Sequence, residues 1–248
     1  MKKLFFKIFG LAFNGDCTMY DRYVWLKKNL VILNENSRLL DVGCGNGWTL
    51  FIGQEMGFKN SIGLSWDEED LQRIKSRTNN FENIELRVGD ARKLGELEID
   101  GKFDAIINAE NIEHIINSNK LIKNISNLLN DGGLLYLTTP SILYKNIYKD
   151  SLVKNPPVED GGHVIRGYSK ERLEKICKKN NLHIISVDYI SGKLSRNLLN
   201  FQRLIPSKII SKIITIPLSI LFNFLDNIFF KNDINNISIA IVAEKIDV

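Results

Sequence analysis

The stretch LLDVGCGNGW, from Leu39 to Trp48, decides the fold of this 248-residue chain. Its apolar beginning is typical of a buried strand, and Asp41 stands directly before the loop that follows. Glycines at alternate positions, 43, 45 and 47, predict a tight turn whose backbone lies close to a ligand. A helix that begins near Trp48 would present its free N–H groups to that ligand.

Two ligand classes fit such a turn. A dinucleotide fingerprint has its third glycine three residues after the second and places pyrophosphate on the helix. Here the spacing is G-x-G-x-G, and Asp41 would repel phosphate but suit a cation such as an α-ammonium group. The stretch closely resembles the first motif of class I S-adenosylmethionine (SAM) methyltransferases, where the turn holds the amino-acid end of SAM. The resemblance runs from about Leu39 to Val187 and weakly to Ala243.

The remaining pattern alternates strands with helices, which predicts a parallel sheet covered on both faces. We expect strands at 38–42, 61–65, 84–88, 103–108, 134–138, 182–190 and 237–243. We expect helices at 20–33, 49–56, 67–77, 120–129 and 169–180, the fourth stopped by Asp131, Gly132 and Gly133. The resemblance implies an antiparallel last strand. The fold class is therefore α/β: a doubly wound, Rossmann-like, seven-stranded, mostly parallel sheet with a helical C-terminal insert before the last strand.

We expect a single methyltransferase domain over 1–248. It comprises an N-terminal helical lead-in at 1–37, a SAM-binding core at 38–194, a helical insert at 195–236 and the last strand at 237–248. Within the core, the irregular segment 141–168 is too long for a plain connection and is predicted to be a lid or substrate loop.

Composition narrows the function classes. The chain is 44% hydrophobic and 25% charged with a net charge of +4, enough for one substantial core. No clustered basic face with interleaved aromatic residues is visible, so no nucleic-acid partner is expected. Cys17, Cys44 and Cys177 have neither zinc nor disulfide spacing, which favours a reducing, cytoplasmic location. The basic, aromatic start, with Phe5, Phe6 and Phe9, is interpreted as a short amphipathic lead-in and not as a signal peptide.

The resemblance implies a set of cofactor-binding residues at the carboxyl ends of the first four strands: Asp41, Gly43, Gly45, Asn46, Ser65, Trp66, Asp90, Ala91 and Asn108. Asp90 is placed like the acid that contacts the adenine amino group in the family. Ser65 is a departure, because related enzymes have an acid there for the ribose hydroxyls. Trp66 is then expected on the adenine or ribose. Asp67 either replaces the missing acid or caps the next helix, and we favour the cap.

The reaction site is predicted in AENIEH, which gives Glu110, Glu113 and His114. On a helix these three would share one face, and His163 in the lid segment would join them. The pattern resembles metal-assisted O-methyltransferases, including the ubiquinone-pathway type. One hypothesis is a divalent cation such as Mg²⁺ held by Glu110, Glu113, His114 and His163. The alternative, which we favour, is metal-free catalysis by Glu113, His114 and His163, with a histidine as base.

The predicted function is SAM-dependent methyl transfer to a hydroxyl of a small-molecule, sugar or lipid-linked acceptor. The alternative is a C- or N-methyltransferase of the same fold acting on a membrane lipid or small metabolite, because GLSW around Ser65 is similar to the lipid cyclopropane synthases. An oxidoreductase would need an acid in place of Ser65. A non-catalytic SAM-binding subunit is a further alternative that the histidines and acids make less favourable.

The insert contains the apolar segment 204–230. Its longest uncharged apolar run, 213–222, is shorter than the ~20 residues that cross a bilayer. We favour a helical cap on the sheet edge or on a second subunit, which allows a homodimer. The alternative is peripheral membrane contact through 204–230, which would bring the enzyme to a lipid-linked acceptor and add a membrane-peripheral location to the cytoplasmic one.

Overall fold

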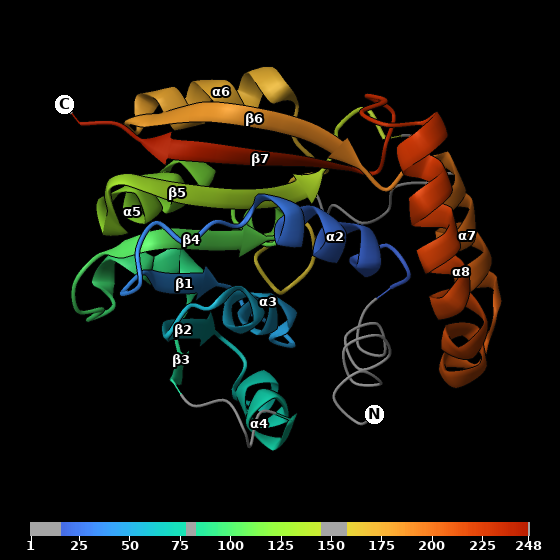
Figure 1. Ribbon diagram of the computed structural model, residues 1–248, viewed down its shortest axis with the longest axis horizontal. Helices are drawn as coiled ribbons and strands as arrows, with labels where there is room; N and C mark the ends of the chain where they lie inside the picture. Colours follow the sequence, from blue (N-terminus) through green and yellow to red (C-terminus); the bar gives the residue numbers. More distant parts are fainter. Residues whose placement is uncertain (1–15, 78–82, 145–157, 248) are drawn as a thin grey trace.

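The computed structural model describes residues 16–77, 83–144 and 158–247, which share one seven-stranded sheet (Figure 1). The strand order is β3-β2-β1-β4-β5-β7-β6, and only β7 runs antiparallel to its neighbours. The strands are β1 (Arg38–Val42), β2 (Asn60–Ser65), β3 (Ile84–Val88), β4 (Phe103–Ala109), β5 (Leu129–Pro140), β6 (Leu182–Ile190) and β7 (Ser238–Lys245). The predicted fold class is confirmed.

Helices cover both faces of the sheet, as a doubly wound fold requires. On one face the core side chains of α2 (Met19–Asn29) and α3 (Trp48–Met56) pack against β1, β4, β5 and β7. On the other face, those of α5 (Ser118–Leu128) and α6 (Lys170–Lys179) pack against the same sheet. The helix α4 (Glu68–Arg77) packs with α3 and β3 at one edge. Two 3₁₀ turns, η3 (Ala91–Glu96) and η4 (Ile112–His114), follow β3 and β4.

Two expected boundaries differ from the structure by more than two residues. The helix predicted to reach residue 33 ends at Asn29, and Leu33 is exposed. The strand expected at 134 begins at Leu129, directly after α5, because a register shift lets Leu129 pair with Phe103. Gly132, at φ +74°, therefore lies in a bulge of β5 and does not stop the helix.

The insert forms two helices, α7 (Lys193–Leu204) and α8 (Lys208–Phe229). They lie at the end of the sheet toward which the parallel strands point (Figure 1). Leu198 and Leu199 of α7 pack with Ile237, the residue before β7. The Asp226 carboxylate of α8 accepts backbone hydrogen bonds from Leu194 and Ser195 at 2.9 and 2.8 Å, which joins the two helices. Residues 1–15 of the lead-in and 145–157 of the lid lie outside the described residues.

Candidate active site

A cavity of about 230 Å³ lies at the carboxyl ends of the parallel strands. Loops after β1, β2, β3 and β4 form its wall, together with the part of the lid segment that begins at residue 158. Six of the nine predicted cofactor-binding residues line it: Gly43, Gly45, Ser65, Trp66, Asp90 and Ala91. The topology brings them together because parallel strands end at one edge of the sheet.

The glycine turn is held in backbone conformations that glycine adopts most easily, with φ of +86° at Gly43 and +47° at Gly45. A Cβ added to Gly43 would lie 2.7 Å from the Asn111 side chain, so this glycine lets Asn111 approach the turn. A Cβ added to Gly45 would meet no atom within 4 Å. Gly45 therefore leaves open space at the cavity wall where a ligand fits.

Three predicted cofactor-binding residues lie outside the cavity wall. The Asp41 carboxylate is buried and accepts a hydrogen bond from the Thr49 hydroxyl, and burial raises the pKa of Asp41 to about 7. Asn108 is also fully buried, and its amide donates to the Val42 carbonyl at 3.1 Å. Among the described residues, Asp41 Oδ1 and Asn108 Oδ1 have no hydrogen-bond partner. The third, Asn46, accepts a 3.4 Å hydrogen bond from the backbone of Trp48.

The cavity wall has an acidic residue near Ser65, although Ser65 itself, at the end of β2, is not an acid. The Ser65 hydroxyl donates to Asp70 at 3.4 Å, and Asp70 lines the cavity. Asp67 instead accepts from the backbone N–H of Glu69 at 2.9 Å, as expected for a helix cap. Asp70 is thus a candidate cofactor contact that the sequence interpretation missed, because it lies in the first turn of α4 and outside the strand-end pattern.

The mouth of the cavity is flanked by Trp66 and the lid segment. Trp66 is 63% exposed, and its ring carbon Cζ2 lies 3.5 Å from the position that a Cβ on Gly161 would take. Arg92 ties the lid segment to η3, because it donates to the Glu159 carbonyl at 3.1 Å and pairs with Asp90 at 2.7 Å. Hydrogen bonds from Arg92 lower the pKa of Asp90, which keeps this carboxylate ionised.

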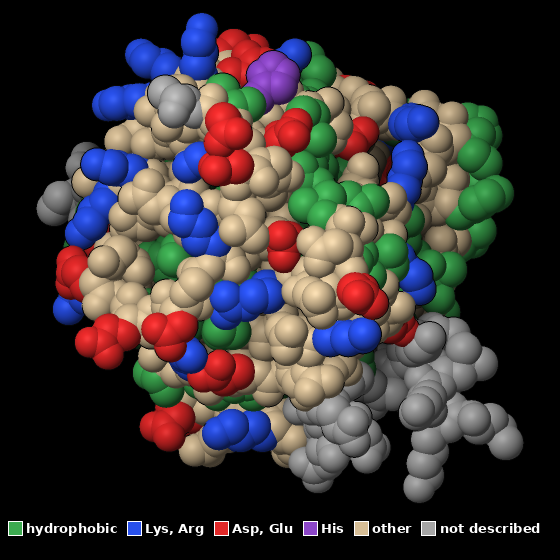
Figure 2. All heavy atoms as spheres, turned by 60° about the vertical axis from the view of Figure 1, so that its left-hand side comes forward, with side chains coloured by type: hydrophobic (Ala, Val, Ile, Leu, Met, Phe, Trp, Pro, Cys, Tyr) green, Lys and Arg blue, Asp and Glu red, His purple; other side chains and the backbone are tan. Residues whose placement is uncertain are grey.

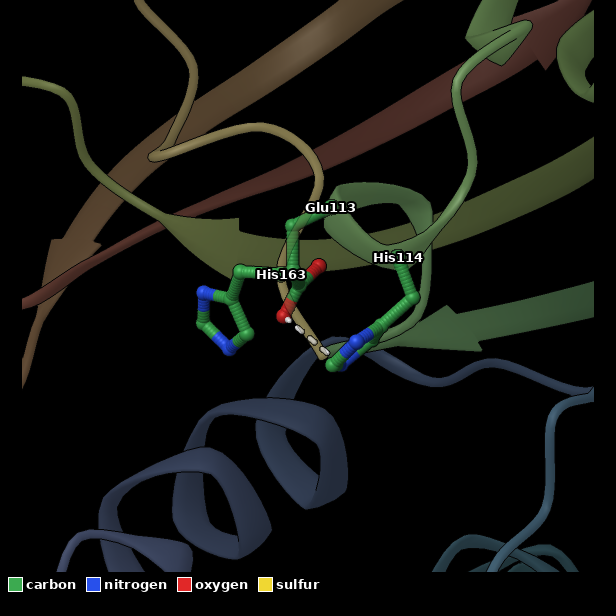
Figure 3. Close-up of side chains that lie close together, drawn as sticks. All are labelled: Glu113, His114 and His163. Atoms are coloured by element: carbon green, nitrogen blue, oxygen red, sulfur yellow. Dashed lines mark ion pairs between the residues drawn. The ribbon is translucent and has the colours of Figure 1, made fainter. Parts of the chain in front are cut away.

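Glu113, His114 and His163 come together as predicted, with ligand atoms within 4.8 Å of one another (Figure 3). The imidazole rings of the two histidines meet edge to face at a centroid distance of 4.8 Å. The Glu113 carbonyl accepts from the backbone N–H groups of Val164 and Ile165 at 2.9 and 3.0 Å, which holds the lid segment beside η4. Two elements far apart in sequence therefore build this cluster.

Hydrogen bonds and burial set the protonation of the cluster. His114 Nδ1 lies 3.0 Å from the Gly162 carbonyl, which only accepts, so Nδ1 carries a proton and the lone pair of the neutral ring is on Nε2. Burial lowers the pKa of His163, which favours its neutral form. Burial, with the nearby Glu110 charge, raises the pKa of Glu113 well above its usual range. The cluster thus contains an imidazole whose neutral form is favoured, that of His163, and a buried carboxyl group, that of Glu113, whose ionised form needs a cation nearby.

The predicted helical face for Glu110, Glu113 and His114 is wrong. The 3₁₀ turn η4 spans only Ile112–His114, and Glu110 precedes it with a left-handed backbone, φ +50°. The Glu110 carboxylate lies 3.7 Å from the Arg22 guanidinium of α2 and is not part of the cluster. Arg22 is a further residue that sequence reasoning missed, because no motif connects it with the strand ends.

Comparison with known proteins gives the family. The chain matches the model of the methyltransferase domain over residues 33–198. It is 27% identical over 170 residues to the ubiquinone biosynthesis O-methyltransferase of Pelagibacter ubique, which covers 66% of this chain and 68% of that protein. It is 31% identical over 143 residues to the demethylmenaquinone methyltransferase of Staphylococcus epidermidis, which covers 54% and 58%.

Solved structures agree on the fold. The phosphoethanolamine N-methyltransferase 2 of Haemonchus contortus, in complex with SAM, has a TM-score of 0.64 at 19% identity, covering 91% of this chain and 52% of that one. The N-methyltransferase NodS of Bradyrhizobium japonicum, in complex with S-adenosyl-L-homocysteine, has a TM-score of 0.59 at 13% identity, covering 94% and 90%.

The chain therefore belongs to the methyltransferase domain family, and it is a SAM-dependent methyltransferase. The cavity, together with the buried strand ends that lead into its wall, fits SAM on two counts. Gly45 leaves open space that any side chain would fill. The acceptor atoms Asp41 Oδ1 and Asn108 Oδ1 are buried without a hydrogen-bond partner among the described residues. The acidic residues around the cavity suit a ligand that carries positive charge.

Proposed function

We propose that this enzyme methylates a hydroxyl group of a small-molecule, sugar or lipid-linked acceptor, with His114 or His163 as the base. The observation that carries the proposal is the pair of imidazoles at 4.8 Å beside the cavity. When bound, SAM supplies an electrophilic methyl group on a sulfonium. A hydroxyl acceptor then needs a group that takes its proton, and a neutral imidazole performs that role near pH 7.

The surroundings of His114 support this assignment. Its Nδ1–H is engaged by the Gly162 carbonyl, so Nε2 is the atom that accepts the proton. The Glu113 carboxyl group lies 3.9 Å from Nε2. Its raised pKa favours the neutral acid at rest, whereas the imidazolium formed by proton transfer favours its ionised form, which in turn stabilises that imidazolium. The Thr139 hydroxyl donates to Glu113 at 3.0 Å and holds that carboxylate in place. Glu113 is therefore a positioning residue.

For SAM itself, we propose contacts from the turn at Gly43 and Gly45 and from Asp90 at the adenine end. Asp41, Asn46 and Asn108 would act from beneath or beside the turn, through buried acceptors or the backbone that they hold.

A divalent cation remains a second hypothesis. Glu113, His114 and His163 would hold it, without Glu110, and it would lower the pKa of the acceptor hydroxyl. Two imidazoles and one carboxylate suit a transition-metal ion better than Mg²⁺, which prefers oxygen ligands. Chelation separates the hypotheses: our proposal expects activity to persist in EDTA, whereas loss with recovery on metal addition favours the cation.

The relatives suggest which acceptors to test first. One is named an O-methyltransferase of ubiquinone biosynthesis and the other a methyltransferase of demethylmenaquinone, so a hydroxylated quinone precursor is the first candidate. The alternative, transfer to carbon or nitrogen, is supported by the second of these names and by the N-methyltransferases among the structures of similar fold.

The decisive assay follows a labelled methyl group from SAM into a panel of hydroxylated acceptors. We expect His114→Gln or His163→Gln to lower kcat by about 10²- to 10⁴-fold while SAM affinity, measured by calorimetry, stays unchanged. His183→Gln on β6 is the matched control, because its side chain is exposed and outside the cavity. Full activity in both cavity variants, or label only on carbon or nitrogen, contradicts the proposal.

A further inference from the structure

The helix α8 presents an apolar side to the outside and a mostly polar side to the protein. The side chains buried against the protein are Ser211, Thr215, Ile216, Ser219 and Asp226. The exposed side is formed by large apolar residues at helical spacing: Ile209, Ile213, Ile220, Phe224, Ile228 and Phe229. A helix on a water-soluble surface normally has the opposite arrangement.

Hydrogen bonds on the inner side fix this orientation. Gln202 of α7 donates to the Thr215 hydroxyl at 3.0 Å, and Asn223 donates to Asp21 of α2 at 2.6 Å. With the Asp226 contacts to the start of α7, these bonds prevent a rotation that would bury the apolar side.

The same contacts bear on whether α8 crosses a membrane. Among the described residues it is the one helix long and apolar enough to do so by length and composition. A spanning helix would leave the polar partners of Thr215, Asn223 and Asp226 and carry those groups into hydrocarbon, which is costly. The geometry therefore favours a helix that stays on the protein and contacts a bilayer surface with its outer side.

Charge around this apolar side is positive. Between residues 203 and 231 the only acid is Asp226, which is buried, whereas Arg203, Lys208 and Lys231 are exposed. Lys208 begins α8 and Lys231 follows its end, so basic groups flank the apolar side at both ends. This arrangement complements anionic lipid headgroups.

We propose that the outer side of α8 docks on an anionic lipid surface. Figure 1 shows α8 at the outer edge of the molecule, and Figure 2, turned by 60° from that view, shows hydrophobic side chains gathered along its right-hand edge. Because α7 and α8 lie at the carboxyl ends of the parallel strands, docking holds the edge of the sheet that carries the cavity near the bilayer. The inference goes beyond the proposed reaction and does not depend on it.

A second copy of the chain fits this side less well. In a two-fold pair of α8 helices that run antiparallel, Lys208 of one copy would approach Lys231 of the other. In a parallel pair each lysine would face its own equivalent. Either arrangement places like charges together, whereas anionic headgroups neutralise them.

The test is vesicle flotation of the full chain, without SAM or acceptor. The vesicles contain phosphatidylcholine alone or phosphatidylcholine with an equal part of phosphatidylglycerol. We expect binding to the anionic vesicles, and the double variant Ile213→Ser/Phe224→Ser should lower the partition coefficient about tenfold or more. Ile185→Ser/Ile246→Ser removes exposed apolar residues elsewhere and should leave binding unchanged.

Charge-reversal variants test whether the lipid surface bound by α8 must be anionic. Lys208→Glu/Lys231→Glu should weaken binding to anionic vesicles and make the remaining binding insensitive to salt, whereas Lys178→Glu on α6 should have little effect. SAM affinity, measured by calorimetry on each variant, shows whether the fold and the cavity are intact.

No flotation with anionic vesicles overturns the proposal. So does flotation that survives the α8 apolar variant with SAM affinity retained. A concentration-dependent dimer that dissociates in the α8 apolar variant, without vesicle binding, assigns the side to a second copy and also overturns it. None of these results depends on which acceptor is methylated, so failure here is distinct from failure of the proposed reaction.

Discussion

Gly45→Ala tests how much the open space beside Gly45 contributes to SAM binding. Gly45 has φ +47° and open space where a Cβ would stand. The substitution therefore causes no clash inside the folded protein and adds only a conformational cost, roughly 1–2 kcal/mol for an alanine in the left-handed region. The added methyl group, however, occupies cavity volume that the cofactor needs.

The size of the effect on binding follows from the cost of overpacking. Inserting one methyl group into a well-packed contact typically costs about 1–3 kcal/mol, which corresponds to about 5- to 160-fold in Kd. We expect isothermal titration calorimetry to show SAM affinity lowered within this range.

Gly132→Ala is the matched control. Gly132 also has positive φ, +74°, and no atom within 4 Å of its hypothetical Cβ, but it lies in the bulge at the start of β5, away from the cavity. Both variants should lower the free energy of unfolding in urea by a similar amount, and only Gly45→Ala should lower SAM affinity. Equal SAM affinity in the two variants contradicts the assignment of the space beside Gly45 to the bound cofactor.

Three other predictions concern charge and stability. Burial raises the pKa of Asp41 from 3.8 to about 7, so between these pH values the folded state keeps a proton that the unfolded state releases. The free energy of unfolding of the wild type should therefore fall as the pH rises through this interval, by at most about 4 kcal/mol. Asp41→Asn should lack this fall in urea unfolding, and parallel pH profiles of the two proteins would contradict the raised pKa. Arg22→Leu leaves Glu110 without its cation and should lower the free energy of unfolding at neutral pH by about 1–3 kcal/mol. The double variant Arg22→Leu/Glu110→Gln should recover this stability, and no recovery contradicts the ion pair. Asp226→Ala removes two hydrogen bonds to the start of α7 and should lower the free energy of unfolding by about 1–3 kcal/mol, measured by thermal unfolding. An unchanged midpoint temperature would show that these bonds contribute nothing to stability.

The sheet was predictable because its signals are local. The apolar runs and glycine turns define five of the seven strands to within one residue of their observed limits, and the alternation of strands and helices fixes a parallel sheet. The start of β5 was missed because its extension depends on pairing with Phe103, which no local pattern reveals. Glycines at 132 and 133 signal a helix end and a bulge equally well.

The candidate site was predictable where residues follow strand ends. Glu113 and His114 come directly after β4, and topology alone places them beside the cavity. Asp70 and Arg22 were missed because they reach the site from helices, through side-chain direction and tertiary packing. Glu110 was misplaced because a left-handed backbone residue breaks the helical spacing assumed for it.

Titration of SAM into the folded wild-type chain measures whether the glycine turn and the acidic cavity after β1 bind SAM. We expect saturable heat with one SAM per chain, and tighter binding as the pH rises through about 7, where Asp41 becomes charged. If a well-folded chain takes up no SAM at any pH, this turn and cavity are not a SAM site.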